Sequence, residues 1–208
     1  MPLWLVRHAQ PLVATGVCYG ALDLPADPQA TASAAQHLAQ QLAQGITVHY
    51  SPLQRCELLV QHLLGLRADL ACKPVPQLRE MDFGHWEGKR WDAIAPAELA
   101  AWTDDFENYR CGAVGETTAE FVRRVHSALL ATVPAPDMSA LPSSTPTVWV
   151  THAGIMRATL WLRQQGWLSH PCGQTLPPVL GLRASDWPQD ALGFGQWLQV
   201  AYPAQSPE

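Results

Sequence analysis

The sequence has 208 residues, of which 48% are apolar and 15% are charged, and its formal net charge at pH 7 is −5. This composition is typical of a globular protein with a sizeable core, and it excludes a disordered chain. The acidic balance is also unlike that of a general nucleic-acid-binding protein, which needs a basic surface to displace counterions.

The cysteines and the N-terminal residues favour a cytoplasmic protein. The five cysteines are odd in number and include no CxxC pair, which favours reduced thiols over a disulfide scaffold. The chain begins without the basic and apolar regions of a signal peptide, and its first apolar run is far too short to span a membrane. We therefore expect neither secretion nor membrane binding.

The N-terminal part of the chain alternates predicted strands with predicted helices. Leu3–His8 is an apolar run that predicts a buried strand, and Pro25 to about Gly45 has the spacing of a helix that ends at a glycine. Ile46–Tyr50 predicts a second strand. Ser51-Pro52 predicts the start of the next helix, because serine is a good N-cap and proline suits the first turn.

The middle of the chain is less regular. Pro74–Leu78 predicts a short extended stretch, and residues 84–116 predict an excursion or lid that contains a helix over Pro96–Asp105. Thr117-Thr118-Ala119-Glu120 matches a capping box and predicts a helix that continues to about Thr132.

The remaining segments return to the strand–helix pattern. Pro134–Pro146 is rich in proline and serine, which predicts an exposed loop. Thr147–Thr151 predicts another buried strand and Ile155–Gln165 an apolar helix. Gln196–Val200 predicts an edge strand.

Apolar strands that alternate with amphipathic helices predict an α/β fold, a three-layer sandwich with a mostly parallel central sheet flanked by helices. We expect one domain over residues 1–203, with the lid as an insertion at about 84–116, and a loose tail over 204–208. In such folds ligands bind at the carboxyl ends of the strands.

Two predicted strands end in the same way. LWLVRH ends in Arg7 and His8, and VWVTHAG places His152 directly after the later strand. Two further segments add charged groups, SPLQR with Arg55 and LREMDFG with Glu80. If the four segments converge, arginine forks match phosphate oxygens, a histidine can attack phosphorus, and a carboxylic acid can protonate a leaving alkoxide. Each residue also has an ordinary structural explanation, so the pattern alone leaves the two interpretations about even.

In their order and in their amino-acid sequences, the four segments resemble those of the histidine phosphatase superfamily, also called the phosphoglycerate-mutase-like family. Its pattern is Arg-His-Gly near the start, Ser-Pro-Leu-x-Arg after the second strand, an acidic residue before Gly-x-x-Glu-Gly, and a late His-Gly. The matching segments here are Arg7-His8-Ala9, Ser51–Arg55, Glu80–Gly88 and His152–Gly154. The resemblance extends from residue 3 to about residue 162, and the segment beyond matches poorly.

The resemblance implies a role for each of the five residues. His8 is expected to be the nucleophile and to become a phosphohistidine, while Arg7, Arg55 and His152 bind the phosphoryl group and stabilise its charge. Glu80 is expected to protonate the leaving group and then to activate water, so it must hold a proton in the first step. His8 must be neutral for attack, with a backbone or polar acceptor on its other ring nitrogen. The substrate is expected to be a small phosphorylated metabolite, with no metal or cofactor, because phosphoryl transfer needs mainly positioning and charge stabilisation.

The sequence departs from the family pattern beside both histidines. Ala9 and Ala153 replace glycines and would be strained if either position needed a positive φ. Pro11 replaces the usual threonine, and the asparagine that helps to hold phosphate has no counterpart after it. Gln10 and Thr15 compensate only in part, so we expect a phosphate pocket with fewer donors.

Two stretches are similar to alpha-ribazole phosphatases of cobalamin assembly, namely residues 16–25 with GVCYG and LDLP, and the run Glu80–Gly88. Cys18 and Tyr19 are therefore candidate substrate contacts, although a packed cysteine and a turn aromatic are simpler explanations. Three tryptophans either line an aromatic wall over a heteroaromatic substrate or form the core of the lid: Trp86, Trp91 and Trp102.

Four other functions stay open. A phosphoglycerate-type mutase or a broad-specificity sugar phosphate phosphatase would use the same residues. Eight histidines invite a metallohydrolase, but the sequence has no HxH or HExxH motif, and activity that is insensitive to EDTA would argue against it. A degenerate, non-enzymatic family member that binds a phosphorylated ligand would explain the alanine changes, but not the presence of all five central residues.

Overall fold

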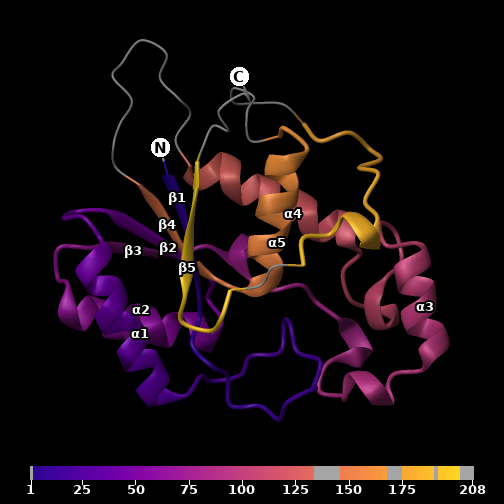
Figure 1. The fold of residues 1–208 in the computed structure, drawn as a ribbon, viewed down its shortest axis with the longest axis horizontal. Helices are drawn as coiled ribbons and strands as arrows, with labels where there is room; N and C mark the ends of the chain where they lie inside the picture. The colour runs from indigo at the N-terminus through magenta and orange to yellow at the C-terminus, as the bar shows by residue number, and fades with distance from the viewer. Residues whose placement is uncertain (1, 134–145, 168–174, 190–191, 202–208) are drawn as a thin grey trace.

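The computed structural model describes residues 2–133, 146–167, 175–189 and 192–201, and a five-stranded sheet lies at its centre (Figure 1). The strands are β1 (Pro2–Arg7), β2 (Thr47–Tyr50), β3 (Ala71–Pro74), β4 (Thr147–Thr151) and β5 (Trp197–Ala201). Their order across the sheet is β3-β2-β4-β1-β5. Neighbouring strands are parallel, except that β5 runs antiparallel to β1 at one edge.

Helices cover both faces of the sheet. α1 (Pro28–Gln41) and α2 (Gln54–Leu66) lie on one face, and α4 (Thr118–Thr132) and α5 (Ala153–Gln164) lie on the other (Figure 1). α3 (Pro96–Asp104) lies farther out, beyond α4 and α5. This arrangement is the three-layer α/β sandwich with a mostly parallel sheet that the sequence predicts.

The side chains of β1 alternate between two cores, which explains why an almost continuous apolar run forms this strand. Leu3 and Leu5 pack on the side of α4 and α5, whereas Trp4 and Val6 pack on the side of α1 and α2. A strand that is buried on both faces needs apolar residues at successive positions. β4 follows the same rule, since all its residues are buried.

The start of α2 differs from the sequence prediction. The helix begins at Gln54, its N-cap residue is Leu53, and no side chain caps it. Ser51, the predicted cap, is fully buried, and its hydroxyl lies 2.8 Å from Nε2 of His152 and accepts a hydrogen bond from the Leu53 N–H. The prediction is wrong because a polar group buried at a strand end must find its partners there, away from the helix terminus.

A second difference follows β3. Pro76–Leu78 forms a 3₁₀ turn, and only Pro74 of the predicted extended stretch belongs to the strand. Proline in the first turn and the buried side chain of Leu78 favour this conformation. The other predicted helices and strands are confirmed within a few residues at their ends. The predicted loop at 134–146 lies almost wholly outside the described residues, and the predicted tail at 204–208 lies outside them entirely.

Residues 84–116 combine α3 with three 3₁₀ turns. Gly84 and Gly112 have positive φ, and a Cβ on Gly112 would lie 2.3 Å from the carbonyl oxygen of Phe83. Only glycine allows two backbone segments to approach so closely. The tryptophans of this segment pack with ring centroids between 5.6 and 6.4 Å apart: Trp86, Trp91 and Trp102. The segment is thus a packed aromatic unit, and its action as a lid stays a prediction.

The capping box predicted at the start of α4 is confirmed. Thr117 Oγ1 accepts a hydrogen bond from the Glu120 N–H at 3.1 Å, and Glu120 Oε2 accepts one from the Thr117 N–H at 3.0 Å. Thr117→Ala should lower the free energy of unfolding by about 1 kcal/mol, because the Glu120 N–H loses its acceptor. Chemical denaturation measures this change. Ser127→Ala, on the exposed side of α4, is the control, and an equal effect in both variants would contradict a specific cap.

Candidate active site

The polar residues that end or follow three neighbouring parallel strands lie together at the carboxyl ends of those strands. β2, β4 and β1 are neighbours in that order, so the residues that follow their carboxyl ends meet. Ser51 and Arg55 follow β2, His152 follows β4, and Arg7 and His8 end β1. The ring centroids of His8 and His152 are 5.1 Å apart. The strand ends that the sequence predicts to meet are therefore together in the structure.

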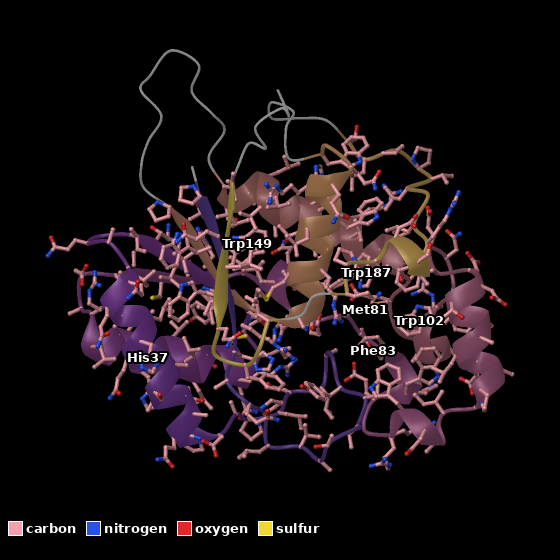
Figure 2. The ribbon with its side chains drawn as sticks, viewed as in Figure 1. His37, Met81, Phe83, Trp102, Trp149 and Trp187 are labelled. Carbon is pink, nitrogen blue, oxygen red and sulfur yellow. The ribbon has the colours of Figure 1, made fainter. Side chains whose placement is uncertain are left out.

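A pocket of about 260 Å³ opens beside these strand ends. Its polar side includes Arg7, His8, Tyr19, Glu80, Gly154 and Arg157. Its apolar side includes Met81, Phe83, Trp102, Phe106, Phe121 and Trp187. Figure 2 shows Met81, Phe83, Trp102 and Trp187 gathered on the same side of the molecule, far from His37 on α1. The pocket therefore offers one part for an anion and another for an apolar or aromatic group.

His8 lies on the polar side of the pocket and is only 2% exposed. Its Nδ1 is 2.7 Å from the carbonyl oxygen of Ala9, so Nδ1 carries the proton and Nε2 keeps its lone pair. Burial, followed by the nearby charge of Arg55, lowers the pKa of His8 to about 3. The imidazole is therefore neutral at neutral pH. The backbone acceptor that the sequence predicts for its second nitrogen is present.

Arg55 and His152 are fully buried behind His8. Arg55 Nε donates to His152 Nδ1 at 3.2 Å, so the proton of the neutral ring is on Nε2, which lies 2.8 Å from the Ser51 hydroxyl. Burial lowers the pKa of His152 well below its usual value, and Arg55 adds to the effect. His152 is therefore neutral here, and its Nε2 is directed at Ser51 and not into the pocket.

Arg7 is held by the C-terminal part of the chain. Its guanidinium carbon lies 3.9 Å from the ring centroid of Phe194, and its Nη1 donates to the carbonyl oxygen of Leu192. Its Nε is buried and has no hydrogen-bond partner in the described part of the chain. Because Arg7 lines the pocket, its guanidinium can donate to an anion bound there.

Glu80 reaches the first turn of α5. Its Oε2 accepts a hydrogen bond from the Gly154 N–H at 2.9 Å, and its Oε1 accepts one from the Met81 N–H at 3.1 Å. A Cβ on Gly154 would lie 2.2 Å from Glu80 Oε1, so only glycine leaves room for the carboxylate here. The carboxyl group lines the same pocket as His8, where it can exchange a proton with a bound ligand.

Four of the predicted substrate contacts lie outside the pocket lining: Arg55, His152, Gln10 and Cys18. Arg55 and His152 are fully buried. Gln10 is exposed, and Cys18 is fully buried in the core on the side of α4 and α5. Cys18 thus matches the simpler explanation, a packed small apolar residue, and burial raises the pKa of its thiol to about 12. Tyr19 does line the pocket, and its hydroxyl interacts with Arg7.

The alanines beside the histidines are accommodated without strain, since neither Ala9 nor Ala153 has a positive φ. The sequence leaves two explanations for the three tryptophans, an aromatic wall over the substrate or the core of the lid, and the three residues divide between them. Trp102 lines the pocket. Trp86 is a core residue with 1% exposure, and Trp91 packs against it. One tryptophan of the three is therefore placed to contact a ligand.

The pocket also contains residues that the sequence motifs do not single out. Arg157 on α5 lines it, with an Nε that is buried and without a hydrogen-bond partner among the described residues. Phe106 and Trp187 pack edge to face with centroids 5.6 Å apart and form part of its apolar side. An arginine in the first turns of an apolar helix directly after His152 is a signal that could have identified Arg157. Trp187 lies in the segment without a motif, so no signal pointed to it.

Metal-ligating residues are not grouped at the site. Across the described ranges, no cluster of three or more His, Cys, Asp or Glu side chains is placed to hold a metal ion. The helices that the structure describes are all too short or too polar to cross a membrane. Independence of metal ions stays a prediction.

The fold and the site together define the class of this protein. The model of the histidine phosphatase superfamily (branch 1) matches residues 3–171. The chain belongs to this family. The match includes all four sequence segments that meet at the strand ends.

Several solved structures share the fold over nearly the whole chain. The protein TTHB049 from Thermus thermophilus is 25% identical, with a TM-score of 0.64, and the match covers 98% of this chain and 95% of that one. A phosphoglycerate mutase from the same organism is 24% identical, with a TM-score of 0.64 and coverage of 98% and 94%. The mycobacterial glucosyl-3-phosphoglycerate phosphatase Rv2419c is 23% identical, with a TM-score of 0.69 and coverage of 95% and 88%. A search of curated proteins gave no significant match.

The lowered pKa of His8 should make the folded protein sensitive to acid. The usual pKa is 6.5, and the folded value is about 3, so below pH 6.5 the unfolded chain binds a proton that the folded chain does not. Stability that is present above pH 6.5 is therefore lost as the pH falls. His8→Gln should reduce the slope of the unfolding free energy between about pH 6 and 4 by about 1.4 kcal/mol per pH unit.

Chemical denaturation at several pH values measures this slope. His37→Gln is the matched control, because His37 is exposed on α1. The change in slope should be confined to the His8 variant. A slope that is the same in His8→Gln and in the parent protein would contradict a buried neutral imidazole.

Proposed function

We propose that this protein is a phosphomonoester hydrolase that acts through a phosphohistidine on His8. The main support is the state of His8, a buried neutral imidazole with its proton held on Nδ1 by Ala9 and with Nε2 free for attack. Arg7 and Arg157 line the same pocket, and neither belongs to the four ion pairs of the described residues. Guanidinium groups without a carboxylate partner suit the oxygens of a phosphate.

The first step transfers the phosphoryl group to the protein. Nε2 of His8 attacks phosphorus and forms a P–N bond while the bond to the leaving oxygen breaks. Glu80 gives its proton to that oxygen, so the alcohol leaves neutral. Arg7 and Arg55 stabilise the charge on the phosphoryl oxygens. The Ala9 carbonyl stabilises the positive charge that the ring acquires, because it already accepts the Nδ1 proton.

The second step regenerates the enzyme. Glu80 is now a carboxylate and takes a proton from water as the water oxygen bonds to phosphorus. The P–N bond breaks, inorganic phosphate leaves, and His8 returns to its neutral form. His152 is fully buried, with Nε2 at Ser51, so we expect its ring to turn away from Ser51 before Nε2 donates to the phosphoryl group.

We infer that the substrate is the phosphate ester of an alcohol with a flat aromatic part, and alpha-ribazole 5'-phosphate is the specific candidate. Trp102, Phe106, Phe121 and Trp187 supply aromatic faces on the apolar side of the pocket. Such faces stack well against a heteroaromatic ring. The sequence of residues 16–25 resembles that of alpha-ribazole phosphatases and supports the same substrate, and with it a place in cobalamin biosynthesis.

Arg157 favours a second candidate, a phosphorylated acid such as 3-phosphoglycerate. A guanidinium that lines the pocket can bind a carboxylate of the leaving group through two parallel hydrogen bonds. A phosphoglycerate-type mutase would act on such an acid, whereas a broad-specificity sugar phosphate phosphatase would act on substrates without the carboxylate. A mutase would also have to retain the substrate while it reorients.

We also infer a cytoplasmic location. The described cysteines are free thiols: Cys18, Cys56, Cys72 and Cys111. Burial raises the pKa of three of them to about 12, so they remain unreactive and need no oxidising compartment: Cys18, Cys56 and Cys111.

A rapid quench in alkaline detergent tests the phosphohistidine, because its P–N bond survives in base and is hydrolysed in acid. The parent protein, mixed with a labelled phosphomonoester at mildly acidic pH, should form an acid-labile phosphoenzyme, with or without EDTA. His8→Ala should abolish the label and lower kcat at least about 1,000-fold, because the nucleophile is gone. His37→Ala is the control and should label like the parent protein. Normal turnover in His8→Ala would refute the mechanism, and substrate binding without label or turnover in the parent protein would identify a degenerate binding protein.

A substrate panel separates the two candidates. Alpha-ribazole phosphate should have a kcat/KM at least about tenfold above those of 3-phosphoglycerate and a sugar phosphate, and Trp187→Ala should remove most of this preference. Arg157→Gln should affect 3-phosphoglycerate more than alpha-ribazole phosphate. Equal slow hydrolysis of all three would count against the ribazole assignment, and conversion of 3-phosphoglycerate to its isomer would identify a mutase.

A further inference from the structure

A turn at residues 18–22 and the segment that follows Phe83 are tied together beside the site. The Cys18 N–H donates to the carbonyl oxygen of Lys89 at 2.7 Å, and the Gly88 N–H donates to the carbonyl oxygen of Cys18 at 2.8 Å. A Cβ on Gly20 would lie 1.8 Å from the carbonyl oxygen of Met81, so the turn lies directly against the chain next to Glu80. The position of this turn is therefore set by its contacts with residues 81–89.

The carboxylate of Glu87 is the side chain that holds the turn. Its Oε1 accepts hydrogen bonds from the Ala21 N–H at 2.8 Å and the Phe83 N–H at 3.0 Å, and its Oε2 accepts one from the Leu22 N–H. Hydrogen bonds from N–H groups to an ionised carboxylate are among the stronger ones in proteins. One side chain thus fixes three backbone groups from two segments.

The same turn holds Arg55 through its carbonyl oxygens. Arg55 Nη2 donates to the carbonyl of Gly20 at 2.6 Å, and Nη1 donates to the carbonyl of Leu22 at 2.9 Å. Arg55 Nε donates to His152 Nδ1 at 3.2 Å. A continuous chain of contacts therefore runs from Glu87 through the turn and Arg55 to His152.

We propose that Glu87 is a positioning residue for phosphoryl transfer, which acts by fixing the turn that orients Arg55 and, through it, His152. Glu87 is not among the pocket-lining residues, and both of its carboxylate oxygens accept backbone N–H groups, so it acts on the turn and not on the substrate. Arg55 has five N–H donors, three of which are taken by the protein, so the direction of the other two depends on the turn. A guanidinium whose orientation is fixed in advance stabilises transferring charge without reorganisation. The expected fall in kcat rests on the proposed phosphohydrolase function, whereas the expected change in the orientation of Arg55 and His152 does not.

The kinetic test uses Glu87→Ala, Glu87→Gln, Arg55→Lys and the double variant Glu87→Ala/Arg55→Lys. Glu87→Ala should lower kcat about 10- to 100-fold with a smaller change in KM, because the guanidinium is misoriented. Glu87→Gln keeps one oxygen acceptor, so its kcat should lie between that of Glu87→Ala and that of the parent protein. In the Arg55→Lys background, Glu87→Ala should have little further effect, since the group that it positions is gone. The proposal would be overturned if the effects of the two substitutions on kcat were fully additive, or if kcat were unchanged in Glu87→Ala.

A second measurement does not depend on activity. The ¹⁵N chemical shift of His152 Nδ1 reports its hydrogen bond from Arg55, and it should move towards that of an unbonded nitrogen in Glu87→Ala. Asp69→Asn is the matched control, because Asp69 also accepts a backbone N–H, from Gly45 at 3.0 Å, but far from the site. It should leave kcat and the His152 signal as in the parent protein. An unmoved His152 signal in folded Glu87→Ala would overturn the proposal, whereas failure of the hydrolase function would appear as a parent protein without a phosphoenzyme.

Discussion

The site depends on one buried positive charge, the guanidinium of Arg55. Such a group is costly to bury unless its donors find acceptors. Arg55 has two backbone carbonyls and a histidine nitrogen as acceptors, and none of the ion pairs of the described chain includes it. A carboxylate partner would have satisfied the donors but cancelled the charge. Carbonyl acceptors leave the charge in place for an anion.

The same charge contributes to the protonation states of both histidines. Burial and then Arg55 lower the pKa of His8 and of His152. A protonated imidazole has no lone pair with which to attack phosphorus, so the neutral state of His8 is the reactive one. In the proposed transfer, the ring becomes cationic when Nε2 bonds to phosphorus, and the phosphoryl oxygens that arrive with it supply the compensating charge. The environment therefore favours the neutral ring before transfer and tolerates the charged ring after it.

Much of the fold and of the polar side of the pocket could be predicted, because both follow from short segments at strand ends. LWLVRH and VWVTHAG are buried on both faces and parallel, so His8 and His152 must meet. The apolar side could be predicted only in part, since Trp102 is a candidate from the sequence and Trp187 is not. Trp187 packs on Phe106, and the segment before it is held by Glu107, which accepts hydrogen bonds from the N–H groups of Leu180 and Leu182 at 2.7 and 3.0 Å. Contacts from a side chain to a backbone place no requirement on the sequence of the segment that they hold, so that segment carries no motif.

Two carboxylates thus hold backbone segments near the pocket. Glu87 holds the turn that binds Arg55, and Glu107 holds Leu180 and Leu182, in the segment that leads to Trp187. Because both act on backbone groups, the side chains of the segments that they hold can change while the positions of those segments are kept. Substitutions near Trp187 can then alter which alcohol is accepted and leave Arg7, His8 and Arg55 in place. In the proposed mechanism, the strand ends therefore carry the phosphoryl-transfer residues, and the segments held through their backbones carry the side chains that would select the substrate.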